Sequence, residues 1–161
     1  MAPNALFDVR TLDLSQIEYD IEEIRKANPQ RYEFEQLTAI LKVFPDEKLI
    51  IGYRDIKADE FWVRGHIPGN PLFPGVLMLE AAAQLATFYR YKMMASEYQF
   101  MGFAGLDKVR FRGSVIPGDQ LIIIAKAIRV SRRMCVFSSQ GFVRNKLVFD
   151  AEITGVTMPS A

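Results

Sequence analysis

One helix-forming run constrains the fold of this chain more than any other feature. Residues 76–95 are rich in Leu, Met, Ala, Glu and Gln with almost no β-branching, and Pro74 stands where the first turn of a helix would begin. Apolar side chains lie nearly all the way round this predicted helix, so it should be buried rather than rest on a surface. Other elements must therefore wrap around it.

The remaining sequence predicts mostly strands. Period-two alternation after the helix indicates four of them, over residues 100–112, 120–132, 134–143 and 146–158. Two earlier apolar runs, 32–44 and 49–56, flank a Pro-Asp-Glu turn and predict a β-hairpin.

The segment before the hairpin predicts a short helix. Asp20 followed by Glu23 has the spacing of a capping box, which favours a helix over residues 21–27. The short gaps between the last strands favour antiparallel neighbours. The expected fold is therefore α+β, a curved antiparallel sheet of about six strands wrapped around one long central helix.

Length and composition limit the classes of function. The 161 residues suit an N-terminal arm over residues 1–19 followed by one domain over residues 20–161. With 20 Lys and Arg against 19 Asp and Glu, the chain has no bulk attraction for nucleic acid or an anionic membrane. One His and one Cys exclude an internal disulfide and any metal site that needs several imidazoles or thiolates, so we expect no metal. No apolar segment reaches the length of a membrane span or forms a signal peptide, so we expect a cytoplasmic protein.

Two residues could act as acid and base. His66, the only histidine, lies in a loop dense in Pro and Gly, and Glu80 occupies the second turn of the predicted helix. A carboxylate among apolar side chains loses hydration, which favours its protonated form and suits a general acid. The histidine is the natural partner base. Gln84 follows Glu80 at i+4 on the same helix face, where its amide could orient the carboxyl group.

The start of the predicted helix offers a third element. The backbone N–H groups of Gly75 and Val76 have no intrahelical acceptor, and the helix dipole favours negative charge there, as a developing oxyanion would require. Taken singly, a loop histidine is most often a surface residue and a Pro/Gly loop is usually only a turn. Their combination with an acid and a helix N-terminus is much less accidental.

Three cations alternate along one predicted strand. Lys108, Arg110 and Arg112 would share one face of the sheet. They form either an ordinary solvated face or a docking patch for an acidic partner, with Arg129, Arg132 and Arg133 as weaker support for docking.

The motif around His66 and Glu80 resembles a known family. Residues 65–84, Gly-His-Ile-Pro-Gly-Asn-Pro-Leu-Phe-Pro-Gly-Val-Leu-Met-Leu-Glu-Ala-Ala-Ala-Gln, resemble the active-site stretch of the FabZ-type β-hydroxyacyl-(acyl-carrier-protein) dehydratases of type II fatty-acid synthesis. The resemblance runs from about residue 20 to residue 157, with further matching stretches at 21–24, 29–32, 105–112 and 115–119.

This resemblance implies a fold, an assembly and a reaction. The implied fold is the hot-dog fold, in a homodimer that often assembles into a trimer of dimers, with His66 of one chain beside Glu80 of the other. The implied enzyme is a hydro-lyase that removes water from a (3R)-3-hydroxyacyl thioester on acyl carrier protein and needs no cofactor. His66 would be the base, Glu80 the acid with Gln84 as its orienter, and the Gly75 amide would polarise the thioester oxygen. The carbonyl group of Leu72 would accept a hydrogen bond from His66.

Two alternatives stay open at this stage. A hot-dog thioesterase would use a carboxylate to activate water, and the Gly-His-x-Pro-Gly loop argues against it. A noncatalytic acyl-binding module could keep the fold but would need neither His66 nor Glu80. The related dehydratase/isomerases resemble this stretch but carry Asp where this chain has Glu80, so dehydration without isomerisation is the better hypothesis.

Overall fold

The computed structural model describes residues 4–93 and 100–158. Its strands form one antiparallel sheet in the order β1-β2-β4-β5-β6-β3. The strands are β1 (Ala39–Phe44), β2 (Leu49–Asp55), β3 (Met101–Phe111), β4 (Gln120–Val130), β5 (Met134–Val143) and β6 (Lys146–Thr157).

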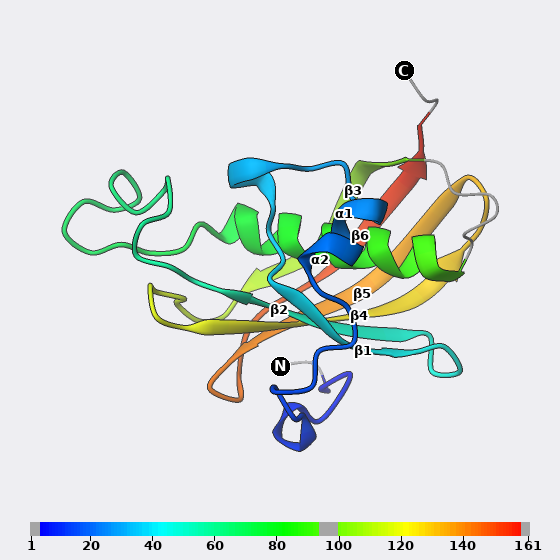
Figure 1. Ribbon diagram of the computed structural model, residues 1–161, viewed down its shortest axis with the longest axis horizontal. Coiled ribbons are helices and arrows are strands. Elements are labelled where there is room, and N and C mark those ends of the chain that lie inside the picture. The colour runs from blue at the N-terminus through cyan, green and yellow to red at the C-terminus, as the bar shows by residue number, and fades with distance from the viewer. Residues whose placement is uncertain (1–3, 94–99, 159–161) are drawn as a thin grey trace.

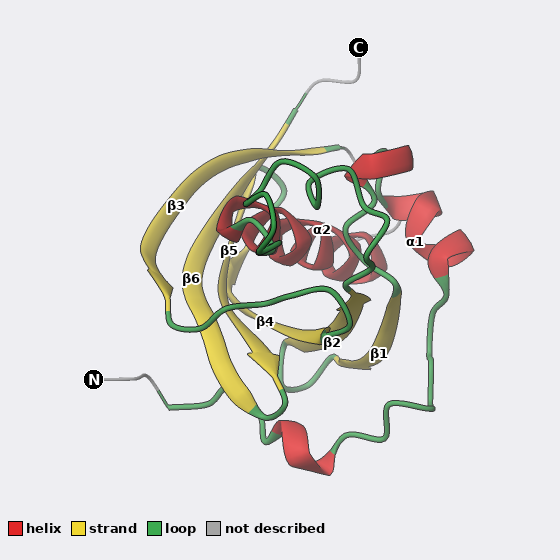
Figure 2. Ribbon diagram, turned by 90° about the vertical axis from the view of Figure 1, so that its left-hand side faces the viewer, coloured by secondary structure: helices red, strands yellow, loops and turns green. Residues whose placement is uncertain are grey.

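A long helix, α2 (Gly75–Met93), lies in the hollow of this curved sheet, which curls around it (Figure 2). A shorter helix, α1 (Ile21–Ala27), lies beside α2 (Figure 1). The expected hot-dog arrangement, with six antiparallel strands and one central helix, is therefore confirmed. No helix within residues 4–93 and 100–158 has both the length and the apolar character needed to cross a membrane.

Most element boundaries agree with the sequence patterns. Helix α1 spans the predicted residues 21–27, and the Asp20 carboxylate accepts a hydrogen bond from the Glu23 N–H at 3.1 Å, as a capping residue should. Strand β5 has the predicted bounds, and β3, β4 and β6 differ from the predicted runs by one or two residues at an end. The predicted end of the long helix, residues 94 and 95, lies outside the described residues.

The predicted strand over residues 32–44 is wrong in its first half. Residues Tyr32–Phe34 form one turn of 3-10 helix, and β1 begins only at Ala39. The backbone of residues 34–36 forms hydrogen bonds with a side chain of α2 instead of with a neighbouring strand. The side-chain amide of Gln84 accepts from the Gln36 N–H and donates to the Phe34 carbonyl group.

The sheet buries apolar side chains on both faces. Alternate residues of β2 point inward or outward: Ile50 packs against α2 in the main core, whereas Leu49 and Ile51 belong to a second cluster on the outer face. The N-terminal arm covers that outer cluster with its own apolar side chains, Leu6, Phe7, Val9 and Leu12. Figure 1 shows the blue arm on the side of the sheet away from α2.

Candidate active site

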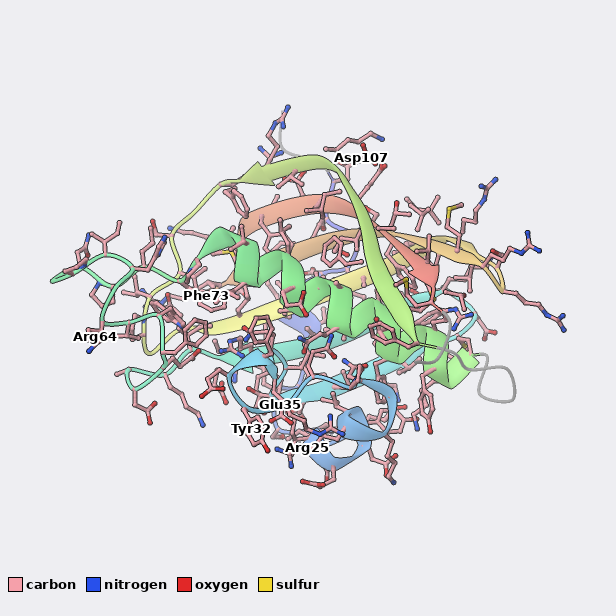
Figure 3. The ribbon with its side chains drawn as sticks, turned by 90° about the horizontal axis from the view of Figure 1, so that it is seen from above. Arg25, Tyr32, Glu35, Arg64, Phe73 and Asp107 are labelled. Carbon is pink, nitrogen blue, oxygen red and sulfur yellow. The ribbon has the colours of Figure 1, made fainter. Side chains whose placement is uncertain are left out.

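His66 lies in a projecting loop whose two ends are buried. Trp62 and Phe73 are 4% and 1% exposed, and their rings meet edge to face with centroids 5.4 Å apart. Between them, residues 64–70 are exposed to solvent. Figure 3 shows Arg64 in the projecting part and Phe73 where the loop returns toward α2. The ends are therefore packed into the core, and the histidine is presented to solvent.

A buried ion pair anchors the start of the loop. The Glu60 carboxylate accepts hydrogen bonds from the Arg54 guanidinium on β2, from the Trp62 indole N–H at 2.9 Å and from the Lys57 backbone N–H at 2.8 Å. The Arg54 and Glu60 side chains are only 9% and 12% exposed, so this pair has little contact with water. Sequence reasoning missed both residues, because nothing in their spacing shows that they meet.

A hydrogen bond to the backbone determines which ring nitrogen of His66 carries a proton. Its Nδ1 lies 2.6 Å from the carbonyl oxygen of Leu72, and the Leu72 N–H donates to the His66 carbonyl oxygen at 2.9 Å. A carbonyl oxygen can only accept, so Nδ1 carries a proton. In the neutral ring, Nε2 is then the basic nitrogen, as a general base requires. This is the contact between His66 and Leu72 that the family resemblance implied.

Glu80 is held through one oxygen only. The side-chain Nε2 atoms of Gln84 and Gln30 both donate to Oε1 of Glu80, at 2.9 and 3.4 Å. No described residue gives Oε2 a hydrogen-bond partner, so that oxygen is available to a substrate. The i+4 spacing indicated Gln84. Gln30 was not predicted, because it comes from a segment 50 residues earlier in the chain.

Gln84 is itself fixed on all sides. It is 2% exposed, and its amide oxygen accepts from the Gln36 N–H at 2.9 Å while its amide nitrogen also donates to the Phe34 carbonyl group at 2.7 Å. The Gln84 carbonyl group accepts from the side-chain amide of Asn28 at 3.0 Å. These bonds determine which end of the amide faces Glu80, and they tie residues 28–36 to α2.

A narrow cavity of about 150 Å³ opens beside Glu80. Its helix wall is formed by Glu80, Gln84 and three small side chains of α2, and its other walls come mainly from β3, β5 and β6. His66 does not line this cavity, which in the described residues of one chain contains the acid without the base. Over the same described ranges, no three His, Cys, Asp or Glu side chains gather as a metal site would need.

Gly75, the first residue of α2, has little room for a side chain. A Cβ atom built on Gly75 would lie 2.7 Å from the ring of Phe111 on β3, far inside a normal contact distance. Glycine therefore allows the ring to cover the helix start. Next to it, the Val76 side chain is 69% exposed. The start of the helix thus lies next to β3, with the Val76 side chain at the protein surface.

Known proteins with similar sequences indicate the family. A family model described as a FabA-like domain matches residues 28–152. A 3-hydroxyacyl-[acyl-carrier-protein] dehydratase FabZ from Geobacter metallireducens is 38% identical over 139 residues, which cover 84% of this chain and 91% of that protein. The chain belongs to the FabA-like family.

A second relative and a solved structure are also similar to this chain. A bifunctional enzyme LpxC/FabZ from Chlorobaculum tepidum is 36% identical over 87% of this chain, which spans only 30% of that longer protein. Among solved structures, the dehydratase heterocomplex ApeI:P from Xenorhabdus doucetiae has a TM-score of 0.72 at 11% identity and covers 85% of this chain and 91% of its own. At that identity the structural likeness supports the fold alone.

In this FabA-like chain the predicted cationic row is already partly paired. Lys108 forms an ion pair with Glu152 at 2.6 Å, and Arg112 pairs with Asp150 at 2.5 Å. Arg110 donates to the Val109 carbonyl group at 2.7 Å. The acidic residues on β6 therefore offset much of the charge that the sequence alone suggested.

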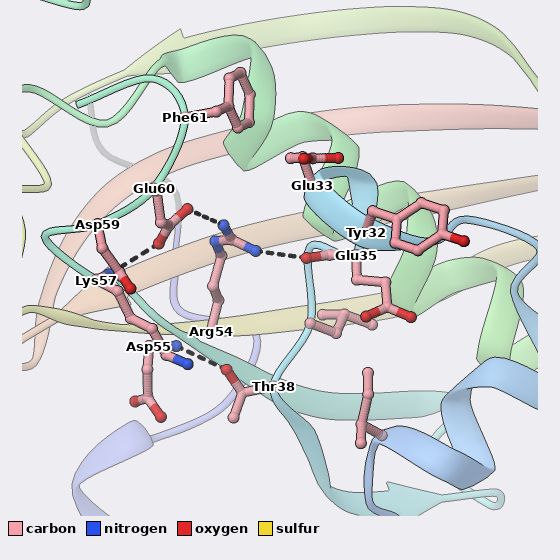
Figure 4. Close-up of a pocket in the computed structure, with 12 residues that line it drawn as sticks. Tyr32, Glu33, Glu35, Thr38, Arg54, Asp55, Lys57, Asp59, Glu60 and Phe61 are labelled. Atoms are coloured by element: carbon pink, nitrogen blue, oxygen red, sulfur yellow. Dashed lines mark hydrogen bonds and ion pairs between the residues drawn. The ribbon is translucent and has the colours of Figure 1, made fainter. Parts of the chain in front are cut away.

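A larger hollow lies apart from the acid and the base. It measures about 660 Å³ and is lined by residues around the Arg54–Glu60 pair, including Tyr32, Glu33 and Phe61 (Figure 4). Neither His66 nor Glu80 lines it. Despite its size, it contributes no group of the candidate site, and the small cavity at Glu80 is the better candidate for a substrate chain.

Proposed function

We propose that this protein removes water from a (3R)-3-hydroxyacyl thioester, carried by acyl carrier protein, and yields the trans-2-enoyl thioester in type II fatty-acid synthesis. The proposal depends mainly on how the Glu80 carboxyl group is held and on the cavity beside it. Two amides hold one of its oxygens, and Glu80 lines a cavity whose walls include Phe137, Ile153 and small side chains of α2. Similarity to FabZ dehydratases over most of the chain supports the same activity.

The proposed step needs one proton acceptor and one proton donor. Nε2 of His66 takes the proton from C2, and the electrons of that C–H bond form the C2–C3 double bond. The C3–O bond breaks as Oε2 of protonated Glu80 gives its proton to the departing hydroxyl group, which leaves as water. The N–H groups at the start of α2, from Gly75 and Val76, polarise the thioester oxygen while negative charge develops on it. No metal or redox cofactor takes part in these steps.

The proposed active unit is a homodimer. Strand β3 ends the sheet, no described strand pairs with its outer edge, and it exposes Phe103, Leu106 and Phe111. An exposed apolar edge strand favours pairing with another strand. We propose that two copies meet at β3 and that His66 of one chain faces Glu80 of the other. A trimer of dimers, the larger assembly that the resemblance implies, would keep the same pairing.

One assay separates the three functional hypotheses. The purified protein is incubated with 3-hydroxyacyl and enoyl thioesters while enoyl absorbance and free thiol are followed together. A dehydratase interconverts the two substrates without thiol release, a thioesterase releases thiol, and a binding module does neither. His66→Ala and Glu80→Ala should each lose at least about a hundredfold in activity. Full activity in either variant would overturn the proposed roles.

Mixed dimers test the shared site. Each single variant is inactive, but a hybrid dimer of His66→Ala and Glu80→Ala subunits contains one site with both groups intact. Co-expression of differently tagged subunits, followed by two-step purification, should recover up to about half of the wild-type activity per dimer. If purified hybrids stay as inactive as the single variants, acid and base do not come from different chains.

The carrier protein is proposed to dock through local positive charge. An acidic partner could replace Glu152 and Asp150 as the partner of Lys108 and Arg112. The exposed Arg129 and Arg133 beside the β4–β5 turn are the competing site. Lys108→Glu with Arg112→Glu should raise KM for a carrier-linked substrate and leave KM for the pantetheine thioester unchanged. If only Arg129→Glu with Arg133→Glu has this effect, docking occurs at the turn.

A further inference from the structure

The cavity beside Glu80 is a short channel along α2. The α2 residues that line it include Glu80, Ala83, Gln84 and Thr87, which stand at i, i+3, i+4 and i+7 on one helix face. Seven residues of helix span about 10 Å, so the channel extends about that far from the carboxyl group. Apart from Glu80 and Gln84, its helix wall is made of small side chains, which leave space for a chain of methylene groups.

Three residues from three strands close the far end. Cys135 on β5 pairs in register with Gly155 on β6, and Gly155 pairs with Phe103 on β3. A Cβ atom built on Gly155 would lie 3.0 Å from Cε of Met101 and 3.1 Å from Sγ of Cys135, so these side chains meet across the glycine. Met101 and Cys135 are 6% and 3% exposed. Buried side chains therefore form this end of the channel.

The closed end is apolar in character. Burial raises the pKa of the Cys135 thiol, which keeps it neutral. The neighbouring walls are formed by Phe137 and Ile153, which are 0% and 3% exposed. A neutral thiol, a thioether and hydrocarbon side chains are a suitable surface for the end of an alkyl chain, and Thr87 and Thr154 are the hydroxyl-bearing residues among the channel's lining.

We propose that Met101, Cys135 and Gly155 set an upper limit to the acyl chain, so that this enzyme acts on short and medium chains. This inference rests on the proposed function, which places C3 of the substrate at Glu80. An apolar protein cavity of about 150 Å³ is known to hold benzene, a molecule of six carbon atoms. About six carbons beyond C3 therefore fill the channel, and acyl chains longer than about eight or nine carbons meet its end.

The length limit is tested with 3-hydroxyacyl pantetheine thioesters of increasing length. We expect kcat/KM to rise about fourfold with each added methylene up to about eight carbons, the gain from burying one methylene group. By twelve carbons it should fall at least tenfold. Met101→Ala should move the optimum to longer chains, whereas Cys135→Leu should move it to shorter ones. A profile that stays flat or rises through sixteen carbons overturns the proposal.

A matched variant separates this effect from loss of stability. Met78 on α2 is 2% exposed and does not line the channel, so Met78→Ala removes the same atoms from the core without opening the channel end. It should keep the wild-type length profile even if its melting temperature falls as far as that of Met101→Ala. If both variants have the same profile, Met101 does not limit chain length.

Binding measurements distinguish a failure of this inference from a failure of the proposed function. Saturated acyl pantetheine thioesters cannot be dehydrated, and their affinities are measured by calorimetry. If affinity has the expected length limit but no substrate is dehydrated, the proposed reaction is wrong and the channel limit stands. If dehydration occurs but neither affinity nor kcat/KM shows a limit, the proposed reaction stands and the channel limit is wrong.

Discussion

Two requirements meet at Gly75, one for its N–H group and one for the absence of a side chain. Its N–H group is proposed to bind the thioester oxygen, and its missing side chain leaves room for the ring of Phe111. The helical backbone at this position is open to any L-residue, so glycine is needed here for space rather than for backbone conformation. Any added methyl group must compete with the ring or with the substrate.

The Gly75→Ala substitution should therefore reduce activity more than stability. Phe111 is 51% exposed, so its ring can turn toward solvent, and we expect a change of less than about 1 kcal/mol in the free energy of unfolding. The methyl group obstructs the approach to the N–H, and kcat/KM should fall at least tenfold. Urea denaturation and the enoyl absorbance assay measure the two effects. Full activity in Gly75→Ala would exclude a close approach of substrate at this position.

A second variant identifies the obstacle. Phe111→Ala is combined with Gly75→Ala, which removes the ring that the new methyl group would displace. If the methyl group itself obstructs the substrate oxygen, the double variant stays as slow as Gly75→Ala. Recovery in the double variant would assign the loss to the displaced ring.

At the scale of elements, the loop that carries His66 depends on a buried charge. Glu60 is the common acceptor for Arg54, Trp62 and the Lys57 backbone, so it joins the loop to β2. Removal of one partner from a buried ion pair leaves the other charge without compensation, which is strongly unfavourable.

We expect Glu60→Ala to lower the free energy of unfolding by about 3 kcal/mol, the lower end of the cost of breaking a buried pair. Activity should fall as well, because the loop loses its attachment near Trp62. Guanidinium denaturation with parallel kinetics measures both effects. Glu33→Ala is the matched control, since Glu33 lines the same hollow but is exposed, and it should change stability by less than about 0.5 kcal/mol. Equal losses in the two variants would refute the anchoring role.

A second ion pair joins α1 to the segment before β1 and gives a pH dependence. Arg25 donates to both carboxylate oxygens of Glu35, at 2.6 and 2.9 Å, and this pairing lowers the pKa of Glu35 below its ordinary value of 4.5. Figure 3 shows the two residues in the same region as Tyr32. A lowered folded-state pKa means that the pair stabilises the protein above pH 4.5 and that this contribution is lost as the pH falls through the lowered value.

The Arg25→Gln variant should therefore be less stable than the wild type at pH 7, with a gap in urea midpoint that closes under acid. Arg25 also binds the more exposed Glu22. Glu22→Gln serves as control and should change the midpoint little at either pH, because exposed pairs contribute little. A gap that stays constant down to pH 2 would show that Arg25 acts through packing and not through the Glu35 charge.

Element type was predictable wherever local pattern decides it. The apolar run of α2, the capping pair of α1 and the period-two strands each indicated the right structure, because side-chain periodicity reports burial directly. Residues 32–38 were wrongly predicted as a strand, because their aromatic and apolar side chains are typical of one. Their backbone instead bonds to the Gln84 side chain, 48 residues away from Gln36, and no local pattern can show that.

The candidate site was likewise predictable only where residues close together in the sequence define it. Gln84 was found because i+4 neighbours share a helix face, and the loop motif indicated His66 and Glu80. Gln30 was missed because its contact with Glu80 joins distant segments. The cavity beside Glu80 depends on side chains from three strands, so its volume and its closed end could be known only from the fold.

At the scale of the whole molecule, the N-terminal arm completes the outer face of the sheet. Gln140 on β5 is 2% exposed and holds the arm at two points, because its amide oxygen accepts from the Leu6 N–H at 2.8 Å and its nitrogen donates to the Asn4 carbonyl group at 3.0 Å. The Phe7 ring packs against Phe44 with centroids 5.5 Å apart. The arm therefore covers apolar side chains that would otherwise face solvent.

Deletion of residues 1–14 should expose that apolar cluster, which includes Leu41, Leu49, Ile51 and Ile124. Large exposed apolar patches promote association, so the truncated chain should form species larger than those of the full chain, with a lower melting temperature. Size-exclusion chromatography with light scattering measures the masses. Gln140→Ala in the full chain should produce a smaller shift in the same direction, since it frees the arm without removing it. Identical masses and melting temperatures for truncated and full chains would show that the arm does not protect this face.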